Sequence, residues 1–188
     1  MSLRFVREFL KSPGTVGAVW PSSPALAGMM IRAARVRTAD FVLEIGPGSG
    51  AFTGPILKNL HSNARFLAVE KCPELARRVS EKFPEARVVA GCATDLATHL
   101  KDQGNPDSIV SGLPWAAFGD SLQDTLLKEI TSSITPDGIF ATFAYFGPHR
   151  LKAGRAFREK LGRHFREIGK TPVVLANLPP AFVYFCRR

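Results

Sequence analysis

The residues best suited to bind a ligand lie in the segment VLEIGPGSGAFT. Glu44 closes an apolar run, and Gly46, Gly48 and Gly50 follow at every second position. Glycines lack a Cβ, so they permit left-handed backbone angles and let a ligand approach the backbone closely. A second acid, Glu70, ends another apolar run 20 residues beyond Gly50, where a carboxylate can accept hydrogen bonds from both hydroxyls of a ribose. The combination predicts a nucleotide-like ligand beside a glycine-rich turn.

The order of apolar and amphipathic segments predicts how these residues are positioned. Strand-like runs alternate with helix-like segments, which is typical of a parallel sheet covered on both faces. Ligands bind beyond the carboxyl ends of such strands, so the glycine turn and Glu70 should meet at one edge. The expected strands are 41–46, 65–70, 86–91, 107–112 and 138–146, and the expected helices are 50–61, 73–83, 94–101 and 120–134.

The two ends of the chain differ from this central pattern. Residues 3–11 form an amphipathic helix candidate, and Ser23 before Pro24 is typical of a helix N-cap. Residues 151–166 predict a basic helix, and 171–188 predict two strands joined by NLPP that finish the sheet as an antiparallel pair. We therefore expect a single α/β domain of Rossmann-like type. Residues 1–37 would form an N-terminal arm of helix, loop and helix, and residues 38–188 the core.

Charge and composition limit the possible partners. The 188 residues carry a net charge of +9. Residues 149–188 hold 10 Lys+Arg against 2 Glu, whereas residues 1–148 hold 15 against 14 acids. This excess indicates an anionic partner, either nucleic acid, a phospholipid surface or a phosphate-bearing substrate, unless it is simply a solvated face. Three scattered cysteines predict neither a disulfide framework nor a metal site, and no apolar run has the ~18 residues of a membrane span.

The pattern acid-x-Gly-x-Gly-x-Gly, with an acid ending the second strand, resembles the Rossmann-like methyltransferases that use S-adenosylmethionine. The resemblance implies that the glycine turn contacts the methionine part, that Glu70 holds the ribose, and that GCATDL (91–96) flanks the adenine. Cys92 stands where many family members have an acid. The implied cofactor site comprises Glu44, Gly46, Gly48, Gly50, Glu70, Lys71, Cys92, Ala93, Thr94, Ser111, Gly112 and Leu113.

The segment SGLPW (111–115) resembles the Asn-Leu-Pro-Tyr or Asp-Pro-Pro-Tyr motif of amino-group methyltransferases, including the ribosomal RNA adenine dimethylases. In those enzymes the Asn or Asp accepts a hydrogen bond from an aromatic amine, which Gly112 cannot do. An aliphatic amine has a localised lone pair and needs only positioning and tolerance of its cation. We assign the catalytic pocket to Trp115, Tyr145 and Tyr184, because aromatic faces attract ammonium groups.

Three further segments, FLKSPGTVGAVWPSSPALA, SGLPW and NLPPAFVY, resemble the bacterial phospholipid N-methyltransferases over essentially the full chain. The resemblance implies S-adenosylmethionine-dependent methylation of phosphatidylethanolamine, and of its mono- and dimethyl forms, to phosphatidylcholine. The alternatives are an ornithine-lipid N-methyltransferase, an RNA or tRNA adenine N-methyltransferase, and a binding module without catalysis. The residues expected to contact the substrate are Trp20, Ser22, Ser23, Arg150 and Arg187.

A lipid substrate requires the enzyme to sit on a membrane without spanning it. The amphipathic segment 3–11 and the basic helix 151–166 are the elements expected to hold it on an anionic surface. We therefore expect a cytoplasmic monomer, peripheral on the inner face of the cytoplasmic membrane, with no nucleic-acid partner.

Overall fold

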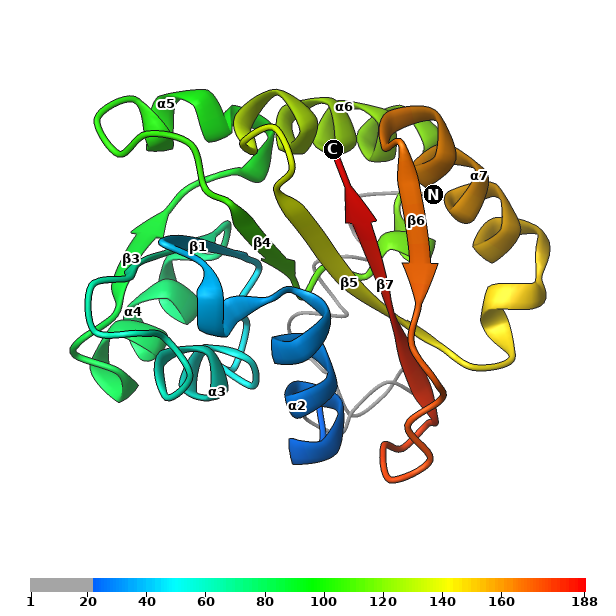
Figure 1. The fold of residues 1–188 in the computed structure, drawn as a ribbon, viewed down its shortest axis with the longest axis horizontal. Helices are drawn as coiled ribbons and strands as arrows, with labels where there is room; N and C mark the ends of the chain where they lie inside the picture. The colour runs from blue at the N-terminus through cyan, green and yellow to red at the C-terminus, as the bar shows by residue number, and fades with distance from the viewer. Residues whose placement is uncertain (1–21) are drawn as a thin grey trace.

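The computed structural model describes residues 22–188, so segment 3–11 and Trp20 lie outside the described residues. Its centre is a seven-stranded sheet in the order β3-β2-β1-β4-β5-β7-β6, in which β7 alone runs opposite to the other six strands (Figure 1). The predicted Rossmann-like fold is confirmed. The strands are β1 (Phe41–Ile45), β2 (Arg65–Glu70), β3 (Arg87–Ala90), β4 (Ser108–Ser111), β5 (Ile139–Tyr145), β6 (Glu167–Lys170) and β7 (Ala181–Arg187).

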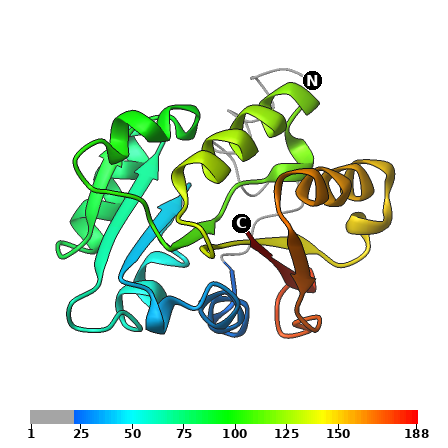
Figure 2. The same cartoon turned by 45° about the horizontal axis from the view of Figure 1, so that its top comes forward.

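Helices cover both faces of the sheet (Figure 2). Because side chains of a strand alternate between faces, β1 sends Leu43 and Ile45 into one core and Val42 into the other. The first core lies under α5 (Leu96–Leu100), α6 (Asp120–Ser133) and α7 (Lys152–His164). The second lies under α2 (Pro24–Ala33) and α3 (Thr53–Leu57). Beside α3 lies α4 (Pro73–Lys82). The ring of Phe83, directly after α4, packs on Gly50 before α3 and on Gly54 within it.

The helices begin and pack where local sequence dictates. Ser23 caps α2, since its Oγ accepts a hydrogen bond from the Leu26 N–H at 3.2 Å and Pro24 takes the first helical position. The predicted apolar stripe of α7 is buried at Phe157 and Leu161. Lys160 is also buried, where its Nζ donates to the Asp124 carboxylate at 2.7 Å and ties α7 to α6. Lys160 of the basic helix therefore stabilises the packing of α7 on α6 and does not contribute a free charge.

The predicted position of the last strand pair is wrong in part. The partner of β7 is β6, directly after α7, whereas residues 171–180 form a loop with one isolated bridge between Val174 and Ala181. Gly169 explains why residues 167–170 pair with β7, because the Phe185 ring of β7 occupies the space where a side chain at position 169 would stand. Pro172 has no N–H for a ladder, so the pairing stops before it. The helix accordingly ends at His164 rather than at residue 166.

Candidate cofactor and acceptor site

The glycine turn follows β1 at the carboxyl edge of the sheet. All three glycines have positive φ angles, +69° at Gly46, +57° at Gly48 and +79° at Gly50. A Cβ on Gly46 would strike Leu113, and one on Gly50 would strike Phe83. A Cβ on Gly48 would meet no atom of the described residues within 4 Å, so this glycine faces open space. The turn is therefore packed at its two ends and open to a ligand at its centre.

Glu70 fixes that turn from the neighbouring strand. One carboxylate oxygen accepts the Gly48 N–H at 3.1 Å, and the other accepts the Cys72 N–H at 2.9 Å. The side chain is only 4% exposed. Each oxygen keeps a second lone pair, so the carboxylate can shape the turn and still accept hydrogen bonds from a ribose.

Glu44 lies under the turn in a fully buried position. Its Oε2 accepts the Thr53 hydroxyl at 2.7 Å, while its Oε1 has no hydrogen-bond partner among the described residues. Burial raises the pKa of this carboxyl to about 8; the Thr53 hydrogen bond lowers it and the nearby Glu70 charge raises it. A buried carboxyl oxygen without a partner, next to an open glycine turn, fits a site that holds a polar ligand.

The end of β4 meets the glycine turn without a side chain between them. Gly112 donates its N–H to Ile45 O at 2.9 Å. A Cβ on Gly112 would lie 2.6 Å from the carbonyl oxygen of Gly46, which is backbone and cannot swing away. An Asn at this position, as in the adenine methyltransferases, would not fit without moving the turn.

We expect Gly112→Ala to weaken binding of S-adenosylhomocysteine severalfold or more, because the added Cβ displaces the Gly46 carbonyl and with it the turn. Gly119→Ala is the matched control, since its Cβ would meet nothing within 4 Å among residues 22–188. Calorimetric titration of both variants, with urea midpoints recorded alongside, tests this. Equal affinities in the two variants would contradict the close contact.

The expected adenine side lies after β3. Thr94 donates its hydroxyl to the Cys92 sulfur at 3.0 Å, and the His99 ring nitrogen lies 3.2 Å from the Cys92 carbonyl oxygen. Ala93 is buried and Lys71, next to Glu70, is exposed. Cys92 and Thr94 thus form a small polar pair where other methyltransferases present an acid, and their contact with the adenine stays a prediction.

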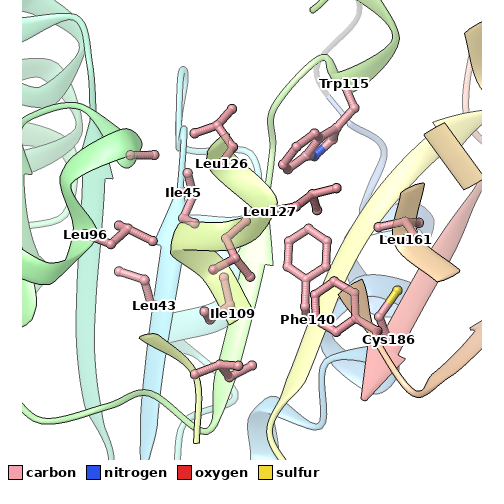
Figure 3. Close-up of a cluster of buried hydrophobic side chains, with 14 of the residues drawn as sticks. Leu43, Ile45, Leu96, Ile109, Trp115, Leu126, Leu127, Phe140, Leu161 and Cys186 are labelled. Atoms are coloured by element: carbon pink, nitrogen blue, oxygen red, sulfur yellow. The ribbon is translucent and has the colours of Figure 1, made fainter. Parts of the chain in front are cut away.

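Trp115 lies in the hydrophobic core and not on a pocket wall. It is 3% exposed and stacks on Phe157 with ring centroids 5.0 Å apart. Its indole N–H donates to the Ser111 Oγ at 3.1 Å, and the ring meets Phe140 edge-on. Figure 3 shows it among the side chains beneath α6 and α7. The prediction that the Trp115 ring holds an ammonium group is therefore wrong, because Phe157 covers one ring face and the side chain is buried. Trp115 instead anchors the segment after β4.

The two tyrosines do not converge either. Tyr145 ends β5 on the face of α2 and α3, where its ring meets Phe143 edge-on at 5.5 Å. Tyr184 faces the opposite side of the sheet, is 2% exposed, and packs edge-on against Phe182 at 4.9 Å. Since alternate strand residues point to opposite faces, the predicted three-ring cage cannot form. Of the three aromatics, only half-buried Tyr145 remains beside the open edge.

The residues expected to contact the substrate divide between the two edges of the sheet. Ser22 and Ser23 precede α2 at the carboxyl edge, and Arg150 follows β5 there, with its guanidinium 5.4 Å from the Phe146 ring centroid. The prediction that Arg187 contacts the substrate is wrong. It pairs with Ile139, the first residue of β5, and so lies at the opposite edge, six residues along β7 from its first residue, or about 20 Å.

Two buried polar residues beside the site were not predicted from the sequence. Thr53 holds the Glu44 carboxylate, and a hydroxyl at the start of an apolar helix after a glycine turn was the available signal. Asn177 is 4% exposed, accepts the Ser23 N–H at 2.9 Å and donates to the Pro179 carbonyl at 2.7 Å. Its place in NLPP marked a turn, but no sequence signal linked it to α2.

Comparison with known proteins agrees with this geometry. No protein-family model matches the chain. It is 30% identical over 188 residues, covering 97% of this chain and 94% of the relative, to the ornithine lipid N-methyltransferase of Singulisphaera acidiphila. It is also 44% identical over 62 residues to the ribosomal RNA small subunit methyltransferase A of Chlorobaculum parvum, covering 33% of this chain and 22% of that protein.

Among solved structures, the N-methyltransferase NodS of Bradyrhizobium japonicum with bound S-adenosyl-L-homocysteine superposes with a TM-score of 0.67 at 13% identity, covering 97% of each chain. This likeness shows the fold. The open glycine turn, the buried acids beside it and the full-length relative together fit S-adenosylmethionine as the cofactor. The chain is an S-adenosylmethionine-dependent methyltransferase and belongs to the family of the ornithine lipid N-methyltransferase of Singulisphaera acidiphila.

Proposed function

We propose that the protein N-methylates the aliphatic amine of a membrane lipid, with an ornithine lipid as the first acceptor to test. The full-length similarity to an ornithine lipid N-methyltransferase carries this proposal. This similarity favours an ornithine lipid, which the sequence left open as an alternative acceptor, over phosphatidylethanolamine. Phosphatidylethanolamine becomes the second acceptor to test. Both lipids present a primary aliphatic amine on a headgroup, so the same site chemistry serves either.

S-adenosylmethionine, when bound, supplies a methyl group activated by its sulfonium sulfur. The chain's residues would hold the acceptor amine against it at the ends of β4 and β5. Leu113 and Pro114 leave β4 as a half-buried, mainly apolar wall, and Tyr145 ends the adjacent strand. Burial raises the pKa of the Tyr145 hydroxyl, which keeps it neutral and able to accept a hydrogen bond from the amine N–H.

The structure of the β4 end argues against a nucleobase acceptor. An aromatic amine needs an acceptor at position 112 because its lone pair is delocalised, and the 2.6 Å approach to the Gly46 carbonyl leaves no space for a side chain there. The matches to ribosomal RNA small subunit methyltransferases A also cover between 33% and 60% of this chain and at most 41% of those proteins.

Methyl transfer from labelled S-adenosylmethionine to defined acceptors tests the proposal. We expect label in ornithine lipid dispersed in detergent, less or none in phosphatidylethanolamine, and none in total RNA. Tyr145→Phe should lower turnover at least severalfold with little change in S-adenosylhomocysteine affinity, whereas Tyr184→Phe, buried on the other face, should change neither. Label in RNA, or no label in any lipid amine, would overturn the proposal.

A further inference from the structure

The carboxyl edge of the sheet carries an apolar surface that the chemistry above does not use. Six large hydrophobic side chains are exposed among residues 22–188, and four of them lie on two loops at this edge. Phe146 and Leu151, 43% and 65% exposed, lie between β5 and α7; Leu175 and Leu178, 78% and 70% exposed, lie between β6 and β7. A hydrogen bond from Phe146 N–H to Pro180 O, at 2.8 Å, joins the loops. We call these four residues the edge surface.

The β6–β7 loop is anchored by hydrogen bonds in a conformation that exposes both of its leucines. Asn177 lies between them in the sequence but is buried, and its side chain bonds both the start of α2 and the Pro179 carbonyl. The Asn177 N–H donates to Val174 O at 3.3 Å. In Figure 1 this loop projects beyond the sheet below β6 and β7. A fixed loop that exposes leucines on either side of a buried polar anchor presents them to something outside the molecule.

Hydrogen bonds at the base of the same loop fix its backbone. Val174 N–H and Ala181 N–H donate to each other's carbonyls at 2.7 and 3.4 Å. Residues 171–180 include three prolines, which have no N–H to satisfy. The N–H groups of Leu175 and Leu178 have no partner among the described residues, and burying unpaired backbone donors in lipid is costly. The leucine side chains therefore enter the acyl boundary while the backbone of the loop stays at the hydrated interface.

The two segments that carry the edge surface contain basic residues and no acids. Residues 143–158 and 168–186 contain Arg150, Lys152, Arg155, Arg158 and Lys170 and no Asp or Glu. None of these five bases makes an ion pair within the described part of the chain. Exposed leucines among unpaired bases match an anionic lipid surface, where apolar side chains enter the acyl boundary and cations meet the headgroups.

We propose that the edge surface is the membrane-docking face and inserts its leucines into an anionic bilayer, so that the carboxyl edge of the sheet faces the lipid headgroups. This inference rests on the proposed lipid acceptor, which has to reach that edge from a membrane. No helix of residues 22–188 is long and apolar enough to span one. The docking elements are then two loops beside the site, with α7 contributing bases at its N-terminal end.

Vesicle co-sedimentation tests the proposal on the full chain. The probe is phosphatidylcholine vesicles with about one third phosphatidylglycerol, compared with pure phosphatidylcholine. We expect Leu175→Ser/Leu178→Ser to bind the anionic vesicles at least about tenfold more weakly, and Lys152→Gln about fivefold more weakly. The matched controls are Leu122→Ser, an exposed leucine on α6, and Lys101→Gln after α5, which should bind as the parent does.

Two further measurements separate the possible results. The loop variant should keep its S-adenosylhomocysteine affinity and its turnover on detergent-dispersed ornithine lipid, because it touches neither. Parental vesicle binding by the loop variant overturns the docking inference, as does an equal loss in Leu122→Ser. A parental dimer that the loop variant converts to monomer would place a second copy on this surface instead, which also overturns it. Failure of lipid methylation by the parent in detergent overturns the proposed function separately.

Discussion

Replacing Glu70 with alanine is expected to weaken binding of S-adenosylhomocysteine by at least about tenfold. The carboxylate accepts the N–H groups of Gly48 and Cys72, and hydrogen bonds to a charged acceptor contribute about 1.5–3 kcal/mol each. The substitution therefore loosens the turn and removes the acceptor predicted for the ribose hydroxyls. Isothermal titration calorimetry of the parent and the variant measures the change directly.

Glu74→Ala is the matched control for this experiment. Glu74 is an exposed acid on α4 that pairs with Arg78 one turn along the helix, and it should leave affinity unchanged. Glu70→Gln should lie between parent and alanine, since an amide oxygen can replace only one of the two carboxylate acceptors. Unchanged affinity in a folded Glu70→Ala protein would show that the carboxylate holds neither the turn nor the cofactor.

The cofactor half of the site could be predicted from sequence because its signals are local. Positive φ at a glycine, an acid at a strand end and the alternation of strands with helices are each written in a few neighbouring residues. The parallel sheet then brings the ends of β1, β2 and β4 together by rule. The approach of Gly112 to the Gly46 carbonyl is a distance between strands, so the sequence could show only that a side chain was missing there.

The acceptor half could not be predicted in the same way. Trp115 follows a strand, Tyr145 ends one and Tyr184 lies within one. The faces that they occupy depend on strand register and on the antiparallel direction of β7. Arg187 appears close to Tyr184 in the sequence, and yet the reversed strand carries it to the amino edge. Strand direction at the C-terminus thus decided which of the predicted residues could share a site.

Replacing Glu44 with glutamine is expected to remove most of the pH dependence of stability between pH 5 and 8. The folded pKa of about 8 lies above the value of 4.5 for an exposed glutamate, mainly because the side chain is buried. Well below pH 4.5 the carboxyl is protonated in both the folded and the unfolded state and imposes no penalty. As pH rises toward 8 the unfolded chain loses the proton first, so the free energy of unfolding of the parent falls.

Glutamine keeps an oxygen to accept the Thr53 hydroxyl and never ionises. Relative to the parent, the variant should therefore gain roughly 3 to 4 kcal/mol on going from pH 5 to pH 8, given the folded pKa of about 8 and the exposed value of 4.5. Urea unfolding of both proteins without cofactor at the two pH values measures this, and contributions from other titrating groups cancel in the difference. Glu74→Gln, exposed on α4, should show no such gain. An equal parent-to-variant difference at both pH values would mean that Glu44 is ionised in the folded protein, and that its unpartnered oxygen has a partner.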